Sequence, residues 1–333
     1  MKNWVFILLL LILSSCKQKS EIVSSIIADI EMVNQVNGRN VGIGGERTEQ
    51  YNNFLLLKEI ASPNQLLELT DHSNPTVRCY AFWALSYNQD FDLFPIVLKH
   101  LEDTSLVTTF FGCFLSEEKV GDFFIDVITP RRIDLRAQSL DSTEQRMLDS
   151  LLLYTHMDFK AKDRALERIT PSEGLYPKIR EIAEGGNRSA MLALAKYQKE
   201  DDISIISNLK TFHRVNRYKF FEAVQYFPHE DFIPYLEENL YKYLEENLDV
   251  YGAGYSRTIE ELYIAIASYK NEHAVELMSI PFTKVEDKKS RESHLFYVTK
   301  GIQANPEPIY DELFCRMIKE GRKILVPSGL ECY

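Results

Sequence analysis

The stretch that decides the fold is Asn-Pro-Thr-Val-Arg-Cys-Tyr-Ala-Phe-Trp-Ala-Leu, residues 74–85. Four of its apolar residues recur on one face of a 3.6-residue helix: Val77, Ala81, Ala84 and Leu85. Asn74 can cap the free amides of such a helix, and Pro75 suits its first turn. A polar turn at 86–92 and a second apolar stretch at 93–101 follow. The segment therefore predicts a helical hairpin.

This pattern recurs with an offset of about thirty residues. One pair of segments aligns Val77 with Val107 and Leu85 with Leu115, and residues 103–105 would cap the second helix. An independent pair matches at the same offset: Ala193 with Ala223, Asp201 with Asp231, and Ile203 with Ile233. Self-similarity at this period is typical of stacked helical repeats, in which each unit covers the apolar face of the next.

Residues 66–103 resemble a HEAT repeat. The residues at the typical places of that pattern are Asp71, Val77, Arg78, Ala81, Ala84 and Leu85. The resemblance continues more loosely over 51–320. It implies an all-α fold, an α-α superhelix of about six or seven helical hairpins occupying residues 51–330, and it says little about function.

Two regions interrupt the period. Residues 129–150 are expected to be an insertion or an irregular unit, and residues 249–258 a glycine-containing loop. Before that loop the sequence Tyr-Leu-Glu-Glu-Asn-Leu occurs twice, which predicts one extended helix. Its apolar stripe belongs to the core: Leu236, Leu240, Leu244 and Leu248.

The first twenty residues look like an export signal. Lys2 is followed by ten consecutive apolar residues, 4–13, a run too short to span a bilayer as a helix. A positive residue, a short apolar run and then small residues are the order of a secretory signal peptide. A buried first helix is the alternative interpretation.

Residues Leu-Ser-Ser-Cys, 13–16, resemble the lipobox of bacterial lipoproteins. The resemblance implies that 1–15 is removed and that Cys16 is acylated with fatty acids such as palmitate, which anchors the protein to a membrane. Because Lys17 rather than Asp follows the cysteine, the resemblance favours the outer membrane of the bacterial cell envelope. Either face of that membrane stays possible. Residues 16–50 are then the lipidated N-terminus, a helix at about 21–36 and a mobile connection at 37–48.

The other four cysteines show no metal-ligand spacing. Cys79 and Cys113 are expected as small buried residues within helices. Cys315 and Cys332 bracket the last segment and could form a disulfide in an oxidising compartment. We expect no metal and no cofactor. The acidic turns at 200–202 and 229–231 are more typical of helix starts than of a cation site.

Composition restricts the function. The chain has 333 residues, is 45% hydrophobic and carries a net charge of −11, with 38 Lys and Arg against 49 Asp and Glu. Such a chain is too apolar to be disordered. Without a basic cluster it opposes nucleic-acid binding, because nucleic acids are polyanions. Signatures such as GxSxG, HExxH and the P-loop are missing from the sequence.

Aromatic residues are crowded at 218–227. Core packing explains most of them, but this helix has more than one core face needs. Tyr218, Phe221 and Tyr226 are therefore candidates for a binding surface, since tyrosine makes a good anchor for partners.

These observations predict a membrane-anchored, non-catalytic scaffold that binds a protein or peptide. Two alternatives stay open. One is a lipid-anchored α/α-type polysaccharide-processing enzyme, which would need two converging carboxylates. The other is a glycan-binding lipoprotein.

Overall fold

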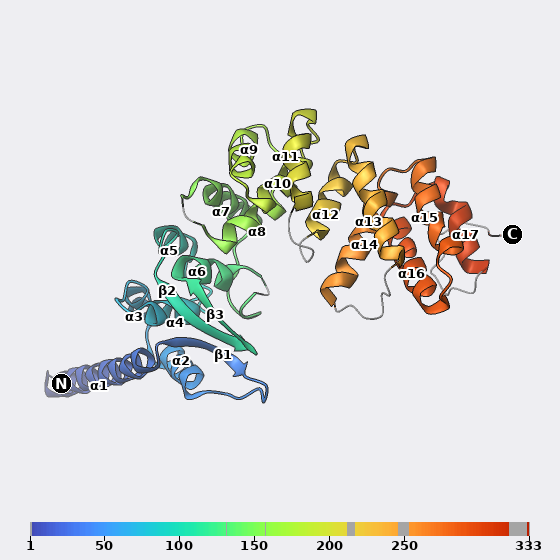
Figure 1. Ribbon diagram of the computed structural model, residues 1–333. Coiled ribbons are helices and arrows are strands. Elements are labelled where there is room, and N and C mark those ends of the chain that lie inside the picture. Colours follow the sequence, from blue (N-terminus) through green and yellow to red (C-terminus); the bar gives the residue numbers. More distant parts are fainter. Residues whose placement is uncertain are drawn as a thin grey trace. The chain divides into compact units, whose positions relative to one another are not determined.

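The computed structural model describes residues 2–130, 132–156, 158–211, 217–245, 253–319 and 332. It separates into two compact units, Met1–Ala165 and Leu166–Tyr333. The protein is mostly α-helical and compatible with a helical superhelix, which confirms the predicted fold class (Figure 1). Within the described residues, strands occur in one small three-stranded sheet.

The first unit contains these elements in chain order: α1 (Lys2–Val33), β1 (Gln35–Val41), α2 (Glu49–Ile60), α3 (Pro63–Leu69), α4 (Pro75–Leu85), α5 (Phe94–Lys99), β2 (Leu106–Gly112), β3 (Phe114–Lys119), α6 (Val120–Ile128), α7 (Ser142–Tyr154) and α8 (Lys160–Arg168). The boundary between the units falls within α8.

Helix α4 is the centre of the first unit. The Asn74 side chain accepts hydrogen bonds from the amides of Thr76 and Val77 at 2.8 and 3.2 Å, as its place before Pro75 predicts. Every residue from 76 to 85 is buried, because α4 contacts α2, α3 and α6 as well as strands β1 and β2. The helix thus packs on all sides rather than through one apolar face.

Two strands replace the first helix of a predicted helical hairpin, whose second helix is present as α6. The thirty-residue offset predicted a helix starting near Val107, and this is wrong: β2 pairs antiparallel with β3 and parallel with β1. The β-branched and aromatic run Leu-Val-Thr-Thr-Phe-Phe favours a strand, and Gly112, with φ +56°, allows a two-residue turn. Cys113 lies exposed in this turn instead of buried within a helix.

The N-terminal region also differs from expectation. Helix α1 ends at Val33, and Asn34 adopts a left-handed conformation with φ +50°, as is common after a helix. The expected connection at 37–48 contributes instead to β1 and to a turn at 42–45. Gly42 supplies the positive φ of +72° that this turn requires.

Residues 129–150 are only partly irregular. The helix α7 begins inside this stretch at Ser142. Its start is a capping box in which Asp141 and Glu144 each accept a hydrogen bond from the other's backbone amide.

The second unit contains these elements: α9 (Tyr176–Glu184), α10 (Arg188–Ala195), η1 (Glu200–Asp202), α11 (Ile203–Ser207), η2 (Asn208–Thr211), α12 (Tyr218–Tyr226), η4 (Glu230–Phe232), α13 (Ile233–Glu245), α14 (Ala253–Ala267), α15 (Glu272–Lys284), α16 (Lys288–Ala304), η6 (Pro308–Tyr310) and α17 (Asp311–Lys319).

Helices of the second unit stack in succession. Helix α10 contacts α12, α12 contacts α14, and α14 contacts α16. The intervening helices pack against this row, for example α9 on α10, α13 on α14 and α17 on α16 (Figure 1). Each helix in the row buries apolar residues on its neighbours, which is how stacked hairpins form a continuous core.

In this unit, residues thirty positions apart occupy the same kind of secondary structure. Ala193 in α10 and Ala223 in α12 are both fully buried, and Asp201 and Asp231 both lie in 3₁₀ turns. The second apolar residue pair, Ile203 and Ile233, begins α11 and α13.

The predicted apolar stripe lies in α13. Leu236 and Leu240 are fully buried, and Leu244 is half-buried. Leu248 lies outside the described residues, as do 249–252 of the expected loop. The expectation of a loop as far as 258 is wrong, because α14 begins at Ala253.

Candidate functional site

A polar and aromatic surface extends along α12 and α14 in the second unit. Helix α12 buries Phe220, Phe221, Ala223 and Val224. The residues of its other side recur at i, i+4, i+7 and i+8, which places them on one helix face: Tyr218, Glu222, Gln225 and Tyr226. Together with Arg257 and Glu261 of α14 they form what we call the α12–α14 face.

Arg257 is the central cation of this face. Its guanidinium carbon lies 4.0 Å from the centroid of the Tyr218 ring, a cation–π contact. One nitrogen lies 3.8 Å from a Glu222 oxygen and another lies 3.7 Å from a Glu261 oxygen. These ion pairs are long, and the Arg257 side chain is 53% exposed. The guanidinium can therefore turn toward an incoming acceptor.

The two carboxylates have different surroundings. Burial and the neighbouring Glu261 carboxylate raise the pKa of Glu222, because both disfavour its charged form. Glu261 accepts a hydrogen bond from the Gln225 side chain at 2.7 Å. A ligand cation would relieve the repulsion between these two groups.

Tyr226 is the most exposed aromatic residue of the face, at 40%. The ammonium of Lys196, from the end of α10, lies 5.2 Å from the centroid of its ring. Burial, followed by the charge of Glu222, raises the pKa of the Tyr226 hydroxyl, so this group stays a hydrogen-bond donor at neutral pH.

A tighter ion pair borders the face. Lys219 of α12 binds Glu167 of α8, which also accepts a hydrogen bond from Ser189 at 2.9 Å. Burial is the largest single effect and would raise the pKa of Glu167, but the hydrogen bond and the charge of Lys219, together with the Ser189 hydrogen bond, lower that pKa overall. This ion pair lies at the edge of the α12–α14 face. Arg257, by contrast, makes only long ion pairs and can change its contacts when a ligand binds.

The structure separates the three predicted surface aromatics. Tyr218 and Tyr226 lie on the α12–α14 face, but Phe221 is fully buried, so its assignment to a binding surface is wrong. Phe221 lies on the core side of α12, where its ring contacts Phe220 and Tyr235 at centroid distances of 6.0 and 6.3 Å. Sequence reasoning missed Arg257 and Glu222, although the spacing from Tyr218 to Glu222 could have indicated the second.

The residues of the HEAT-like pattern have structural contacts. The four apolar members are buried in α4: Val77, Ala81, Ala84 and Leu85. The Arg78 Nε lies 2.9 Å from a carboxylate oxygen of Asp103. The Arg78 guanidinium also donates a 2.7 Å hydrogen bond to the carbonyl of His72. Asp71 pairs with Lys99 and, at 3.2 Å, with His100. The Lys99 hydrogen bond lowers the pKa of Asp71 against the effect of burial.

Acidic residues in the turns of the second unit form hydrogen bonds and ion pairs with other residues of the protein. Asp202 is fully buried, accepts a hydrogen bond from the Tyr176 hydroxyl and pairs with Arg180 at 3.0 Å. Glu200 lies 3.0 Å from His229 of the next turn. Among the described residues, no three His, Cys, Asp or Glu side chains are grouped as metal ligands.

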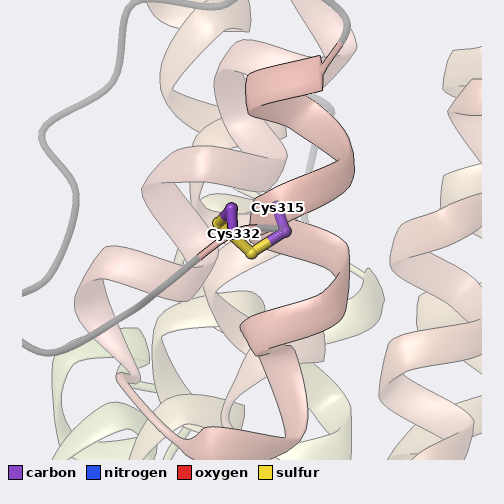
Figure 2. The surroundings of a disulfide bond; sticks show 2 residues. All are labelled: Cys315 and Cys332. Carbon is purple, nitrogen blue, oxygen red and sulfur yellow. A yellow bond between two sulfur atoms is a disulfide. The ribbon is translucent and has the colours of Figure 1, made fainter.

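Two cysteines are joined near the C-terminus. Cys315 on α17 forms a disulfide with Cys332 (Figure 2). Cys79 is free and buried within α4. Cys16 falls within helix α1, which continues unbroken across the predicted cleavage point.

None of the described helices combines the length and apolar character that crossing a bilayer requires. No protein-family model, curated protein or solved structure matches the chain.

Proposed function

We propose that the protein is a bacterial lipoprotein, anchored to the outer membrane through Cys16, that binds a protein or peptide partner through the α12–α14 face. The observation that carries the proposal is the exposed Arg257 guanidinium between Tyr218 and two carboxylates. Arginine and tyrosine are residue types that dominate protein recognition, and here Arg257 and Tyr226 are exposed. The anchor rests on the lipobox-like residues 13–16.

The surface supports recognition of a partner with mixed charge. Arg257 can bind a carboxylate of the partner, while Glu222 and Glu261 can bind its lysine or arginine. Tyr226 offers a rigid, partly apolar ring at little entropic cost. We retain the HEAT-like resemblance as a proposal for the origin of the stacked hairpins.

A photo-crosslinking experiment tests the binding surface. A benzophenone amino acid is placed at Tyr226 in the full-length, membrane-associated protein, and the matched control carries it at Tyr241 of α13, which is 50% exposed. We expect one adduct of defined mass at position 226, absent at 241 and lost with Arg257→Glu. Equal crosslinking at both positions, or an adduct unaffected by Arg257→Glu, would contradict the proposal.

The enzymatic alternative has a distinct outcome. Glu222 and Glu261 share Arg257, an arrangement that supports ion pairing rather than acid–base work. Incubation with a panel of envelope polysaccharides should give no turnover. Turnover that disappears in Glu222→Gln would replace the scaffold proposal with catalysis.

The anchor is tested separately. Metabolic labelling with palmitate should mark the wild-type protein and leave Cys16→Ala unlabelled, and only the wild type should stay with membranes after a carbonate wash. A Cys79→Ala variant, whose thiol is buried, is the matched control.

A further inference from the structure

Strand β3 (Phe114–Lys119) is an edge of the sheet in the first unit. It pairs with β2 on one side, and within the described residues no strand pairs with its other side. Phe111 and Phe114 close the two-residue turn, and hydrogen-bonded pairs alternate along an antiparallel ladder. The backbone groups of Leu115 and Glu117 therefore point away from β2. An unpaired edge of this kind is a template for another strand.

The edge strand exposes large apolar side chains. Phe114 is 79% exposed and Leu115 65%. Leu115 lies opposite Phe110 of β2, and Leu106 at the start of that strand is 57% exposed. Exposed apolar residues gathered on an uncovered strand indicate an interaction surface.

The charge of Glu117 on strand β3 restricts which segment can pair with this edge. Glu117 follows Leu115 by two residues, so both side chains lie on one face of the sheet. No ion pair of Glu117 occurs among the described residues, and its backbone carbonyl accepts a long hydrogen bond of 3.5 Å from the exposed Lys160 side chain. An arriving strand can displace that flexible lysine.

We propose that the β3 edge binds an extended segment of a partner protein as a fourth strand, with an apolar residue opposite Leu115 and a basic residue opposite Glu117. A second copy of the chain fits less well. In the antiparallel self-pairing register centred on Glu117, the two Glu117 side chains lie directly opposite each other, and like charges on adjacent strands are destabilising. The net charge of −11 adds to this repulsion.

This site goes beyond the proposed scaffold function. It lies in the first unit and recognises main-chain groups, whereas the α12–α14 face lies in the second unit and offers side chains. An experiment can therefore refute the β3 site without refuting the α12–α14 face, and the reverse.

A peptide-binding experiment tests the proposal. The probe is a fluorescent peptide of about six residues, the usual length of a strand, in which a valine and a lysine stand two positions apart with threonine between them, so that both face the same side. It is compared with the same peptide methylated on the backbone nitrogens that would pair with β3, and with a peptide in which glutamate replaces lysine. We expect saturable binding of the first peptide alone, with slower hydrogen exchange at the amides of Leu115 and Glu117.

Protein variants complete the test. Glu117→Lys should weaken binding about fivefold, the usual range for one cross-strand charge pair. Glu59→Lys is the matched control, because it makes the same charge change on an exposed residue of α2 and should leave affinity unchanged. Glu117→Pro should abolish binding while the circular dichroism spectrum is retained, because an edge strand tolerates proline.

Several results would overturn the proposal. Equal binding of the methylated peptide would show simple charge attraction instead of strand pairing. Absence of saturable binding by the unmodified peptide would also refute it. A dimer in sedimentation experiments that Glu117→Pro dissociates would assign the edge to a second copy of the chain.

Discussion

The imidazole Nδ1 of His294 lies 2.9 Å from the hydroxyl oxygen of Tyr263, and both side chains are fully buried between α14 and α16. Burial lowers the pKa of His294 from 6.5 to about 4, although a hydrogen bond with the Tyr243 backbone acts in the opposite direction. Burial also raises the pKa of Tyr263. The pair is therefore neutral at physiological pH, as a polar contact inside an apolar core should be.

Acid should destabilise the protein through His294. Between pH 6.5 and 4 the unfolded state binds a proton at this residue and the folded state does not, so the free energy of unfolding falls as pH falls. The loss should reach about 3 kcal/mol at pH 4. Urea denaturation at about pH 7 and pH 4 should show that His294→Gln removes this part of the pH dependence. His156→Gln, at an exposed histidine, is the control. Identical pH profiles for wild type and His294→Gln would refute the assignment.

Breaking the Arg78–Asp103 pair should destabilise the first unit. Their side chains are only 10% and 16% exposed, and Arg78 also binds the carbonyls of His72 and Ser73. Arg78→Met leaves Asp103 partly buried without its partner, and should cost about 3 kcal/mol in denaturant unfolding. In a double-mutant cycle with Asp103→Asn, a coupling energy below about 0.5 kcal/mol would contradict a strong interaction.

The exposed pair of Lys199 and Glu173 gives a comparison for that cycle. Its nitrogen–oxygen distance is 3.1 Å, but the two side chains are 35% and 81% exposed. Lys199→Met should lower the free energy of unfolding far less than Arg78→Met does, because water screens an exposed pair.

Removing the Cys315–Cys332 disulfide should loosen the C-terminal end. The bond closes a loop with a sequence separation of 17 residues, and a loop of this length contributes about 3 kcal/mol. Replacing both cysteines by serine should lower the unfolding midpoint, and a reductant should then have no further effect. Cys113→Ser, at an exposed free cysteine, should leave the midpoint unchanged. A reductant-insensitive wild type would contradict the prediction.

A methyl group at Gly301 should not fit. A Cβ built there would lie 2.6 Å from the carbonyl oxygen of Tyr263, where α16 approaches α14. Gly301→Ala should therefore cost about 1–3 kcal/mol, the usual range for overpacking. Gly174→Ala is the matched control, because no atom lies within 4 Å of the added Cβ. Equal thermal midpoints for the two variants would show that the helices separate without cost.

Local signals predicted several elements correctly. Asn74 and Pro75 marked the start of α4, and the leucine spacing at 236 and 240 marked the buried side of α13. Both depend on interactions within one or two helical turns, which the sequence displays directly. The all-α fold class was predicted from the helical spacing of apolar residues.

The sheet could not be predicted in this way. Residues 106–119 matched the helical unit at an offset of thirty, yet they form a hairpin, and β1, from a distant part of the sequence, pairs with β2. Pairing of this kind depends on long-range contacts, which outweigh local similarity.

The sequence by itself determined the helical class and several helix starts, because capping and helical periodicity are properties of neighbouring residues; the anchor at Cys16 stays a prediction from a signal motif. Only the tertiary structure decided which aromatics reach the surface, that Arg257 lies over Tyr218, and that β3 is an unpaired edge. Those facts depend on residues brought together across many turns of the chain, where burial and charge are set by the packing of whole elements.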